Sequence, residues 1–354
     1  MGLCKIKKDI CGVLITDKFV SGPNPRAAGK NGGFFMTKKE RVWSVIQGKE
    51  ADHVPTGFSL HFAKEKAAGE EGVNSHLTFF RETDTDIIKI MNENLVPDVG
   101  EIKVPKDWDK IPSYSLRDDF MQRQIEMTQR IMEQADGDAF AIGTLHGVCA
   151  SAIHPIEARY GYEKVRELFC THIRENKAPV IEAFKRITDG MCQLAAKYKE
   201  LGLEGIYYAA LGGEMRYFTD EEFQECIEPF DRQILKASRE AGGVNFLHIC
   251  KNGLNMKRYE GYGDLADVVN WGVYETDFSL EEGRKMFPGT AIMGGLANRS
   301  GVLVDGTIGE LQDAVKEMIH TFGKKGFILG ADCTLPTEID YARIKAMTQA
   351  AREA

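Results

Sequence analysis

The sequence predicts an α/β protein whose residues 36–354 form a single (β/α)8 barrel of the TIM type with added N-terminal helices. Eight short apolar runs bounded by Gly, Asn or Asp recur along the chain, and segments with helical spacing of apolar residues lie between them. Strands that alternate with helices pair in parallel, and eight such units are typical of a closed barrel. The predicted strands are residues 54–60, 86–91, 139–145, 205–211, 245–250, 268–273, 290–296 and 326–332.

The first helix is predicted to begin after Thr37, which can cap it, with Glu40 three residues on as in a capping box and Gly48 at its end. Later helices are predicted over residues 116–135, 161–202 and 219–242. Residues 1–35 end in SGPNPRAAGKNGGFF, whose Gly, Pro and Asn content favours neither helix nor strand. We interpret this segment as a flexible leader that the barrel does not need.

An open, doubly wound sheet is the alternative architecture. It would need a strand followed by a Gly-rich dinucleotide turn and a ribose-binding acid. The nearest approach is GGLANRSG (294–301), which reads more simply as a turn. The barrel is therefore the favoured fold.

Charge and composition exclude several classes of function. The formal net charge is −8 and Lys and Arg are not clustered, which argues against nucleic acid or an acidic membrane surface as a partner. No apolar run reaches the roughly 18 residues of a membrane span, and no secretory signal is recognisable. We therefore expect a cytoplasmic protein whose eight cysteines are reduced thiols.

Polar side chains finish most of the predicted strands. In a (β/α)8 barrel, active sites lie at the carboxyl ends of the strands, so these residues are the first candidates for a site. They are His61, Asn92, Glu93, His146, Glu214, His248, Cys250, Asn270, Asn298, Arg299 and Cys333. Any one of them can be an ordinary solvated residue, and the cluster carries more weight than its members.

His248 and Cys250 are two apart at the end of one predicted strand, so they face the same side, roughly 7 Å apart along it. Imidazole and thiolate are ligands that zinc prefers, and Cys333 at the end of the last strand offers a third. Three protein ligands with one open position are typical of catalytic zinc. The alternative is that both cysteines are buried core thiols and that His248 is a hydrogen-bonded strand residue.

Three stretches resemble the uroporphyrinogen decarboxylase superfamily. They are MTKKERVWSVIQGKEADHVPTGF (36–58), AIMGGLANRSGVLVDGT (291–307) and FILGADCTLPTEIDYARIKAMTQAARE (327–353). Within the superfamily, the chain resembles the zinc-dependent, corrinoid-linked methyltransferases. Their His-x-Cys pair and distant Cys map onto His248, Cys250 and Cys333, and the resemblance therefore implies a zinc site.

The resemblance implies two directions of methyl transfer. In the favoured one, the enzyme moves a methyl group from a small donor, such as an aryl methyl ether, to Co(I) of a corrinoid on a partner protein. The sequence itself has no Asp-x-His-x-x-Gly motif that would ligate cobalamin. The alternative direction is transfer from the methylcorrinoid to a thiol of the coenzyme M type.

Residue roles follow from the favoured direction. His61 and His146 are candidate proton donors to the leaving oxygen, and Glu214 is a candidate fourth zinc ligand or base. Candidate substrate-binding residues are Phe58, Phe62, Asn92, Asn270 and Trp271.

Two further readings stay open, as does a homodimer. Uroporphyrinogen decarboxylation is a minor alternative, because FSLHFAKEKAAG (58–69) stands where the decarboxylases carry an Arg-rich stretch that binds carboxylates. A non-enzymatic zinc scaffold or sensor is the other.

Overall fold

The structure is a computed structural model and describes residues 35–354. Its centre is one parallel sheet whose seven strands follow the order of the chain, β1-β2-β3-β4-β5-β6-β7. The strands are β1 (Ile87–Ile90), β2 (Phe140–His146), β3 (Gly205–Ala210), β4 (Val244–Ile249), β5 (Val268–Trp271), β6 (Ala291–Leu296) and β7 (Phe327–Ala331). The predicted leader lies, apart from Phe35, outside the described residues.

The predicted strand at residues 54–60 is not a regular strand, so the eight predicted strands become seven in the described part of the chain. The segment instead makes single parallel bridges, one of them from Thr56 to Leu329 of β7. Thr56 O also accepts from Asp86 N at 3.0 Å, just before β1. Residues 54–60 therefore lie between β7 and β1, and Pro55, which has no N–H, limits the ladder they can form.

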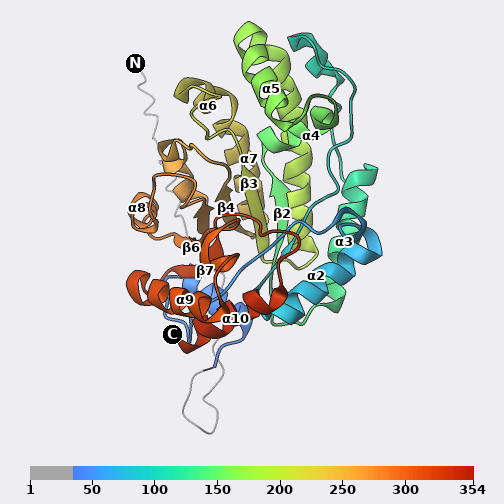
Figure 1. Cartoon of the computed structure of the whole chain (residues 1–354). Coiled ribbons are helices and arrows are strands. Elements are labelled where there is room, and N and C mark those ends of the chain that lie inside the picture. The colour runs from blue at the N-terminus through green and yellow to red at the C-terminus, as the bar shows by residue number, and fades with distance from the viewer. Residues whose placement is uncertain (1–34) are drawn as a thin grey trace, which may run out of the picture.

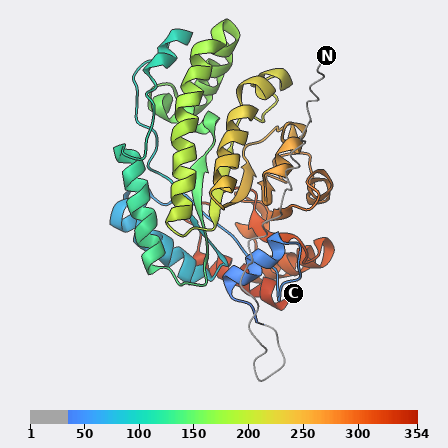
Figure 2. The same ribbon diagram turned by 180° about the vertical axis from the view of Figure 1, so that it is seen from behind.

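The helices surround the sheet, as the two opposite views in Figures 1 and 2 show. The capping box predicted for the first helix is present, with Thr37 and Glu40 bonded reciprocally. The predicted helix at 219–242 is divided near Pro229, because its ring cannot continue the hydrogen-bond ladder. The α-helices are α1 (Lys38–Ile46), α2 (Gly69–Thr83), α3 (Asp119–Gln134), α4 (Val148–Tyr160), α5 (Tyr162–Glu200), α6 (Asp220–Cys226), α7 (Glu228–Glu240), α8 (Leu280–Met286), α9 (Ile308–Phe322) and α10 (Tyr341–Glu353).

Helix α1 closes one end of the sheet's interior. Val42 and Val45 of α1 are fully buried in the same cluster as Phe140, Val244 and Val268, which stand at the beginnings of their strands. The Trp43 ring packs edge-on against Phe140, 5.7 Å between centroids. The amino ends of the strands are thus filled with apolar side chains, which leaves the carboxyl ends for polar groups.

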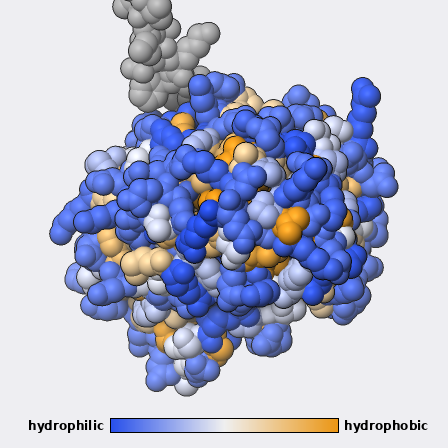
Figure 3. Space-filling view, turned by 90° about the horizontal axis from the view of Figure 1, so that it is seen from above, coloured by the Kyte–Doolittle hydropathy of each residue, from blue (hydrophilic) through white to orange (hydrophobic). Residues whose placement is uncertain are grey.

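The face in Figure 3 is mainly hydrophilic, with small hydrophobic spots between polar side chains. Within residues 35–354, no helix combines the length and the hydropathy that crossing a bilayer requires.

Candidate metal centre and adjoining cavity

The carboxyl ends of β4 and β7 bring together three side chains of the kinds that bind metal ions. His248 lies on β4, Cys250 directly follows it, and Cys333 stands two residues beyond the end of β7. The ligand atoms of the three residues all lie within 4.8 Å of one another. The spacing argument from the sequence correctly placed these side chains at one point, although their role as metal ligands stays a prediction.

Asn270 of β5 fixes the orientation of the His248 ring. Its Nδ2 donates to the carbonyls of Met293 at 3.0 Å and Ala331 at 3.1 Å, so its Oδ1 must act as an acceptor. That Oδ1 lies 2.6 Å from His248 Nδ1 and accepts from the Tyr207 hydroxyl at 2.9 Å. His248 Nδ1 therefore carries the proton. Its buried Nε2, which has no hydrogen-bond partner within the described chain, keeps a free lone pair.

The two sulfur atoms interact directly. A hydrogen bond to Cys333, together with burial, raises the pKa of Cys250 well above its ordinary value. The same hydrogen bond lowers the pKa of Cys333, and the neighbouring His248 and Lys89 lower it further. Asn298 supports this loop by donating to Thr334 O at 2.9 Å. The pair thus holds thiolate character at a buried site, as metal binding requires.

A cavity of about 180 Å³ adjoins the three residues. Its walls are mostly aromatic and aliphatic, with histidines and lysines among them. The lining residues are His61, Lys89, Met91, Thr144, His146, Ala150, His154, Tyr162, Tyr207, Ala209, Leu211, His248, Cys250, Lys251, Cys333 and Thr334.

Lys89 of β1 is a site residue that the sequence reasoning missed. Its Nζ donates to Ser59 Oγ at 3.1 Å and lies 3.6 Å from the centroid of the Tyr207 ring. Burial lowers its pKa to about 8, against the opposing effect of the two nearby cysteines. The signal was present, since DIIKIM places a lysine inside an otherwise apolar strand.

Lys251 immediately follows Cys250 and has a left-handed backbone, with φ of 89°. Such a conformation is costly for a residue other than Gly, Asn or Asp, and it persists only where the surroundings enforce it. Cys250 N donates to Ala210 O at 3.1 Å just before this turn. The Lys251 ammonium lies 4.4 Å from the centroid of the Tyr162 ring.

Of the two histidines predicted as proton donors, His61 lines the cavity at its exposed side. Its side chain is 51% exposed, and its Nδ1 lies 2.5 Å from Glu93 Oε1. Although burial opposes the effect, the hydrogen bond from His61 lowers the pKa of Glu93, so Glu93 is an ionised acceptor. His61 Nδ1 then holds a proton, and its Nε2 is left to exchange one.

His146, the other predicted donor, also lines the cavity but is buried. Its ring packs edge-on against His154 of α4, with 4.8 Å between centroids. Burial, with the adjacent His154, lowers the pKa of His146 to about 3, and burial lowers that of His154 to about 4. Both imidazoles are therefore neutral near pH 7, and neither supplies an imidazolium.

Glu214, predicted as a fourth zinc ligand or base, lies apart from the three ligand-type side chains. Its fully buried carboxylate forms an ion pair with Arg166 of α5, which is itself 4% exposed, and also accepts from Gly212 N at 3.2 Å. Glu214 does not line the cavity and is not part of the His–Cys–Cys cluster. The position of Glu214 is explained by Arg166, a buried cation that needs a counter-ion. The local sequence around Glu214 does not reveal this partner.

None of the five predicted substrate-binding residues lines the cavity. Phe58 and Trp271 are core residues, and Trp271 packs outward under Gly283 of α8 because its neighbour Asn270 faces inward. Asn92 lines a separate, very small cavity and accepts from Asn94 N. Asn270 itself contacts His248 and does not line the cavity.

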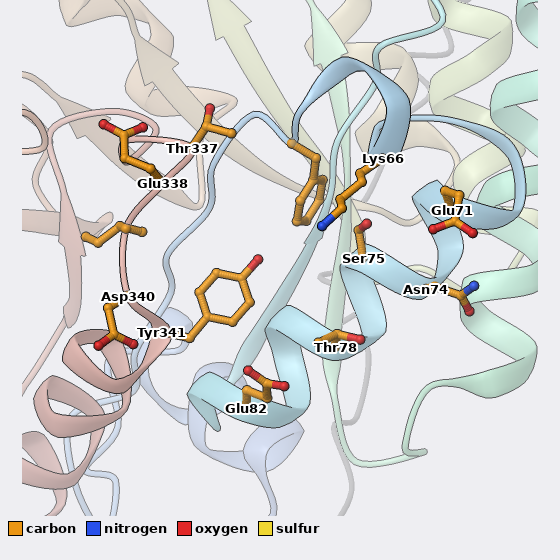
Figure 4. Close-up of a pocket in the computed structure, with 12 residues that line it drawn as sticks. Lys66, Glu71, Asn74, Ser75, Thr78, Glu82, Thr337, Glu338, Asp340 and Tyr341 are labelled. Atoms are coloured by element: carbon orange, nitrogen blue, oxygen red, sulfur yellow. The ribbon is translucent and has the colours of Figure 1, made fainter.

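Phe62 lines a second, open groove of about 550 Å³. Figure 4 shows this groove between α2, which contributes Ser75 and Thr78, and the segment that leads into α10, which contributes Thr337 and Tyr341. Thr337 Oγ1 donates to His61 O at 2.8 Å, so the groove and the cavity share a wall near His61.

Comparison with known proteins is consistent with this architecture. Among solved structures, a methyltransferase from Methanosarcina mazei superposes with a TM-score of 0.69 at 14% identity, over 90% of this chain and 99% of its own. A B12-independent methionine synthase from Shewanella, in complex with selenomethionine, gives 0.54 at 12% identity, over 85% and 97%. The putative B12-independent methionine synthase of Listeria monocytogenes gives 0.50 at 13% identity, over 79% and 85%. At these identities the likeness concerns the fold.

No curated protein sequence matches the chain. The model of the uroporphyrinogen decarboxylase family, in contrast, matches residues 88–354, which include the whole sheet from Ile88 onward and the His–Cys–Cys cluster. The chain therefore belongs to the uroporphyrinogen decarboxylase family.

Proposed function

We propose that this protein is a zinc-dependent methyltransferase that moves a methyl group from a small aryl methyl ether to Co(I) of a corrinoid carried by a partner protein. The observation that carries the proposal is the convergence of His248, Cys250 and Cys333 at the wall of a cavity. One imidazole and two thiols, with a cavity beside them, are a donor set suited to catalytic zinc with one open position.

The donor set fits zinc in its details. His248 Nε2 has its lone pair free because Asn270 holds the proton on Nδ1, and this support of a ligand by a fixed neighbour is typical of metal sites. The hydrogen bond from Cys250 lowers the pKa of Cys333, which favours the thiolate form that binds a metal. Bound zinc would supply a Lewis acid that polarises the ether oxygen of the donor.

The chain's own residues would complete the reaction by handling the leaving oxygen. When the methyl group departs, the oxygen becomes anionic and needs stabilisation or a proton. His61, held by the ionised Glu93, is placed at the exposed side of the cavity to exchange that proton. His146 and His154 are neutral and serve as cavity walls.

The cavity speaks against a tetrapyrrole as substrate. Its volume of about 180 Å³ is below the roughly 300–1,000 Å³ of pockets for drug-sized ligands, so it suits a single-ring molecule. Its lining includes no arginine, whereas a molecule with many carboxylates needs several charged donors. Porphyrinogen decarboxylation therefore remains a minor alternative despite the family name.

Two architectural elements belong to the proposal. The segment at 54–60 would serve as the eighth position of a (β/α)8 barrel, bonded to β7 on one side and near β1 on the other. The corrinoid would arrive on its own protein and dock at the carboxyl ends of the strands, where the cavity lies.

The test is a visible-light assay of the corrinoid. Zinc-loaded protein, 4-methoxybenzoate and cob(I)alamin should yield methylcobalamin and the free phenol, without any thiol. Cys250→Ala should abolish the reaction and His61→Ala should slow it, since the first removes a zinc ligand and the second only a proton donor. Consumption of methylcobalamin by coenzyme M, with no turnover of the ether, would instead establish the thiol-methylating direction. One bound zinc with no methyl transfer in either direction would favour the scaffold or sensor.

A further inference from the structure

The sulfur atoms of Cys250 and Cys333 lie close enough to react with each other. They lie within 4.8 Å of one another, and a hydrogen bond links the two side chains. A disulfide bond joins sulfur atoms about 2.0 Å apart. Closing the gap requires a movement of less than about 3 Å, which two side chains can share. The two thiols that would hold zinc are therefore also placed to form a disulfide.

Both cysteines stand just beyond the ends of their strands. Cys250 directly follows β4, and Cys333 is the second residue after β7. Rotation about the Cα–Cβ bond moves each sulfur atom and leaves the backbone where it is. The two sulfur atoms can therefore approach each other without breaking a hydrogen bond of the sheet.

A small oxidant can reach this pair through the cavity. Cys250 and Cys333 both line the cavity and are partly exposed, and His61 lies at the exposed side of the same cavity. The remaining cysteines within residues 35–354 do not line it, and they are Cys149, Cys170, Cys192 and Cys226. Oxidation that enters by this route therefore meets two thiols that are each other's neighbours.

We propose that Cys250 and Cys333 form a reversible disulfide when the metal-free protein meets a hydroperoxide, which makes the metal centre a redox switch. The disulfide itself follows from the positions of the sulfur atoms, and only its consequence rests on the proposed zinc-dependent function. Oxidation removes both thiolate ligands and leaves His248 as the sole remaining member of the ligand set, so zinc binding is lost. A thiol reductant restores the two ligands and, with zinc, the activity.

The oxidation balances with hydrogen peroxide as the oxidant. The thiolate of one cysteine attacks a peroxide oxygen, so that an S–O bond forms and the O–O bond breaks. The hydroxide that leaves takes the proton that this thiol had released, and a sulfenic acid remains. The second sulfur then attacks the sulfenic sulfur, so that the S–S bond forms and the S–O bond breaks, and the departing hydroxide takes the second thiol's proton. The two sulfur atoms are oxidised, the peroxide is reduced, and two water molecules result.

Thiol counting and peptide mapping test the disulfide without any measurement of activity. The full-length protein, freed of metal by a chelator, would be treated with hydrogen peroxide, blocked at its remaining thiols and digested. Two thiols should be lost, and a cross-linked peptide pair that contains Cys250 and Cys333 should appear and then disappear with dithiothreitol. The oxidised protein should also melt at a higher temperature than the reduced, metal-free protein, because a cross-link between distant positions restricts the unfolded chain. Zinc content should fall from one ion to none on oxidation and return after reduction.

Three variants control the experiment. Cys250→Ser and Cys333→Ser should each abolish the cross-link, and the thiol that remains should proceed to sulfinic acid, which dithiothreitol does not reverse. Cys192→Ser is the matched control, because Cys192 is also partly exposed and is not part of the cluster. It should leave the cross-link and its reversal unchanged. Circular dichroism of each reduced variant identifies any that has lost its fold.

The outcomes separate the two proposals. Sulfinic acid at Cys250 or Cys333 with no peptide that joins them, or a cross-link that survives either of the two serine variants, would overturn the redox switch and leave the zinc site intact. A reversible disulfide between Cys250 and Cys333 in a protein that binds no zinc when reduced would retain the disulfide and remove the proposed metal centre. Equal zinc binding by the oxidised and reduced proteins would contradict the inference that the disulfide displaces the metal.

Discussion

Replacing Asn270 with leucine should weaken zinc binding although Asn270 is not a ligand. The change keeps the approximate volume of the side chain and removes all four hydrogen bonds that Asn270 makes. His248 then loses the hydrogen-bond acceptor that keeps its proton on Nδ1. The same acceptor orients the imidazole ring relative to the thiols of Cys250 and Cys333. Loss of such support typically costs about 10- to 100-fold in metal affinity, or about 1.4–2.8 kcal/mol.

The same change should destabilise the protein even without metal. The carbonyls of Met293 and Ala331 and the hydroxyl of Tyr207 are buried, and each would lose a partner at a cost of about 1–3 kcal/mol. Asn270→Asp separates the two effects, because a carboxylate still accepts from His248 and no longer donates to the carbonyls. We expect Asn270→Asp to unfold more easily than the parent protein and to hold zinc within a few-fold of its affinity.

The assay is competition for zinc with a chromophoric chelator, at a temperature where circular dichroism shows each variant folded. Unfolding of the metal-free proteins in urea gives the second quantity. Asn298→Ala is the matched control, because it removes a hydrogen bond to a backbone carbonyl, that of Thr334 beside Cys333, and leaves the His248–Asn270 hydrogen bond in place. Wild-type zinc affinity in Asn270→Leu, or an equal loss in Asn270→Asp, would refute the role given to the Nδ1 hydrogen bond.

Three further predictions concern the cluster and the buried charges. Cys250→Ala or Cys333→Ala should sharply reduce bound zinc, measured by metal analysis, while circular dichroism stays unchanged; full metal retention in both would exclude the assignment. His76 is buried, with a pKa lowered to about 4 by burial, so folding favours its neutral form and the free energy of unfolding should fall as pH drops from about 6.5 toward 4. The loss should approach about 3 kcal/mol, and urea titrations of His76→Gln should show a flatter pH dependence over that range than the parent. Arg166→Met should destabilise the protein by about 3–5 kcal/mol because it leaves Glu214 as an uncompensated buried charge, and the double variant with Glu214→Met should recover most of that loss. Zinc content should not change in either variant. A loss of zinc would indicate that Glu214 takes part in the metal centre.

Local periodicity explains which parts of the structure the sequence could predict. Two-residue alternation put His248 and Cys250 on one face, and the apolar runs located all seven strands of the sheet. It failed at residues 54–60, which are extended but bonded only at isolated points, because periodicity does not report how many ladder bonds a segment finds. The boundary of the flexible leader stays a prediction.

The rest of the site depends on contacts between residues distant in sequence. Glu214 was placed in the centre on its position after a strand, whereas its partner Arg166 lies 48 residues earlier. Lys89 was overlooked because a lysine in a strand usually marks a solvent-facing position, and here the strand faces the interior. Trp271 was predicted to bind substrate, whereas its side chain packs against Gly283 of α8, which the local sequence does not indicate.

Helix α1 covers the amino ends of the strands, opposite the ends at which the cavity lies. Val42, Val45 and Trp43 pack against the beginnings of the strands and block access from that side. A small molecule must therefore enter the cavity between the loops that follow the strands. A protein that docks on those loops would also block access to the cavity. A small substrate must therefore bind before such a protein docks, and its product can leave only after that protein dissociates. Binding and release would then follow a fixed order.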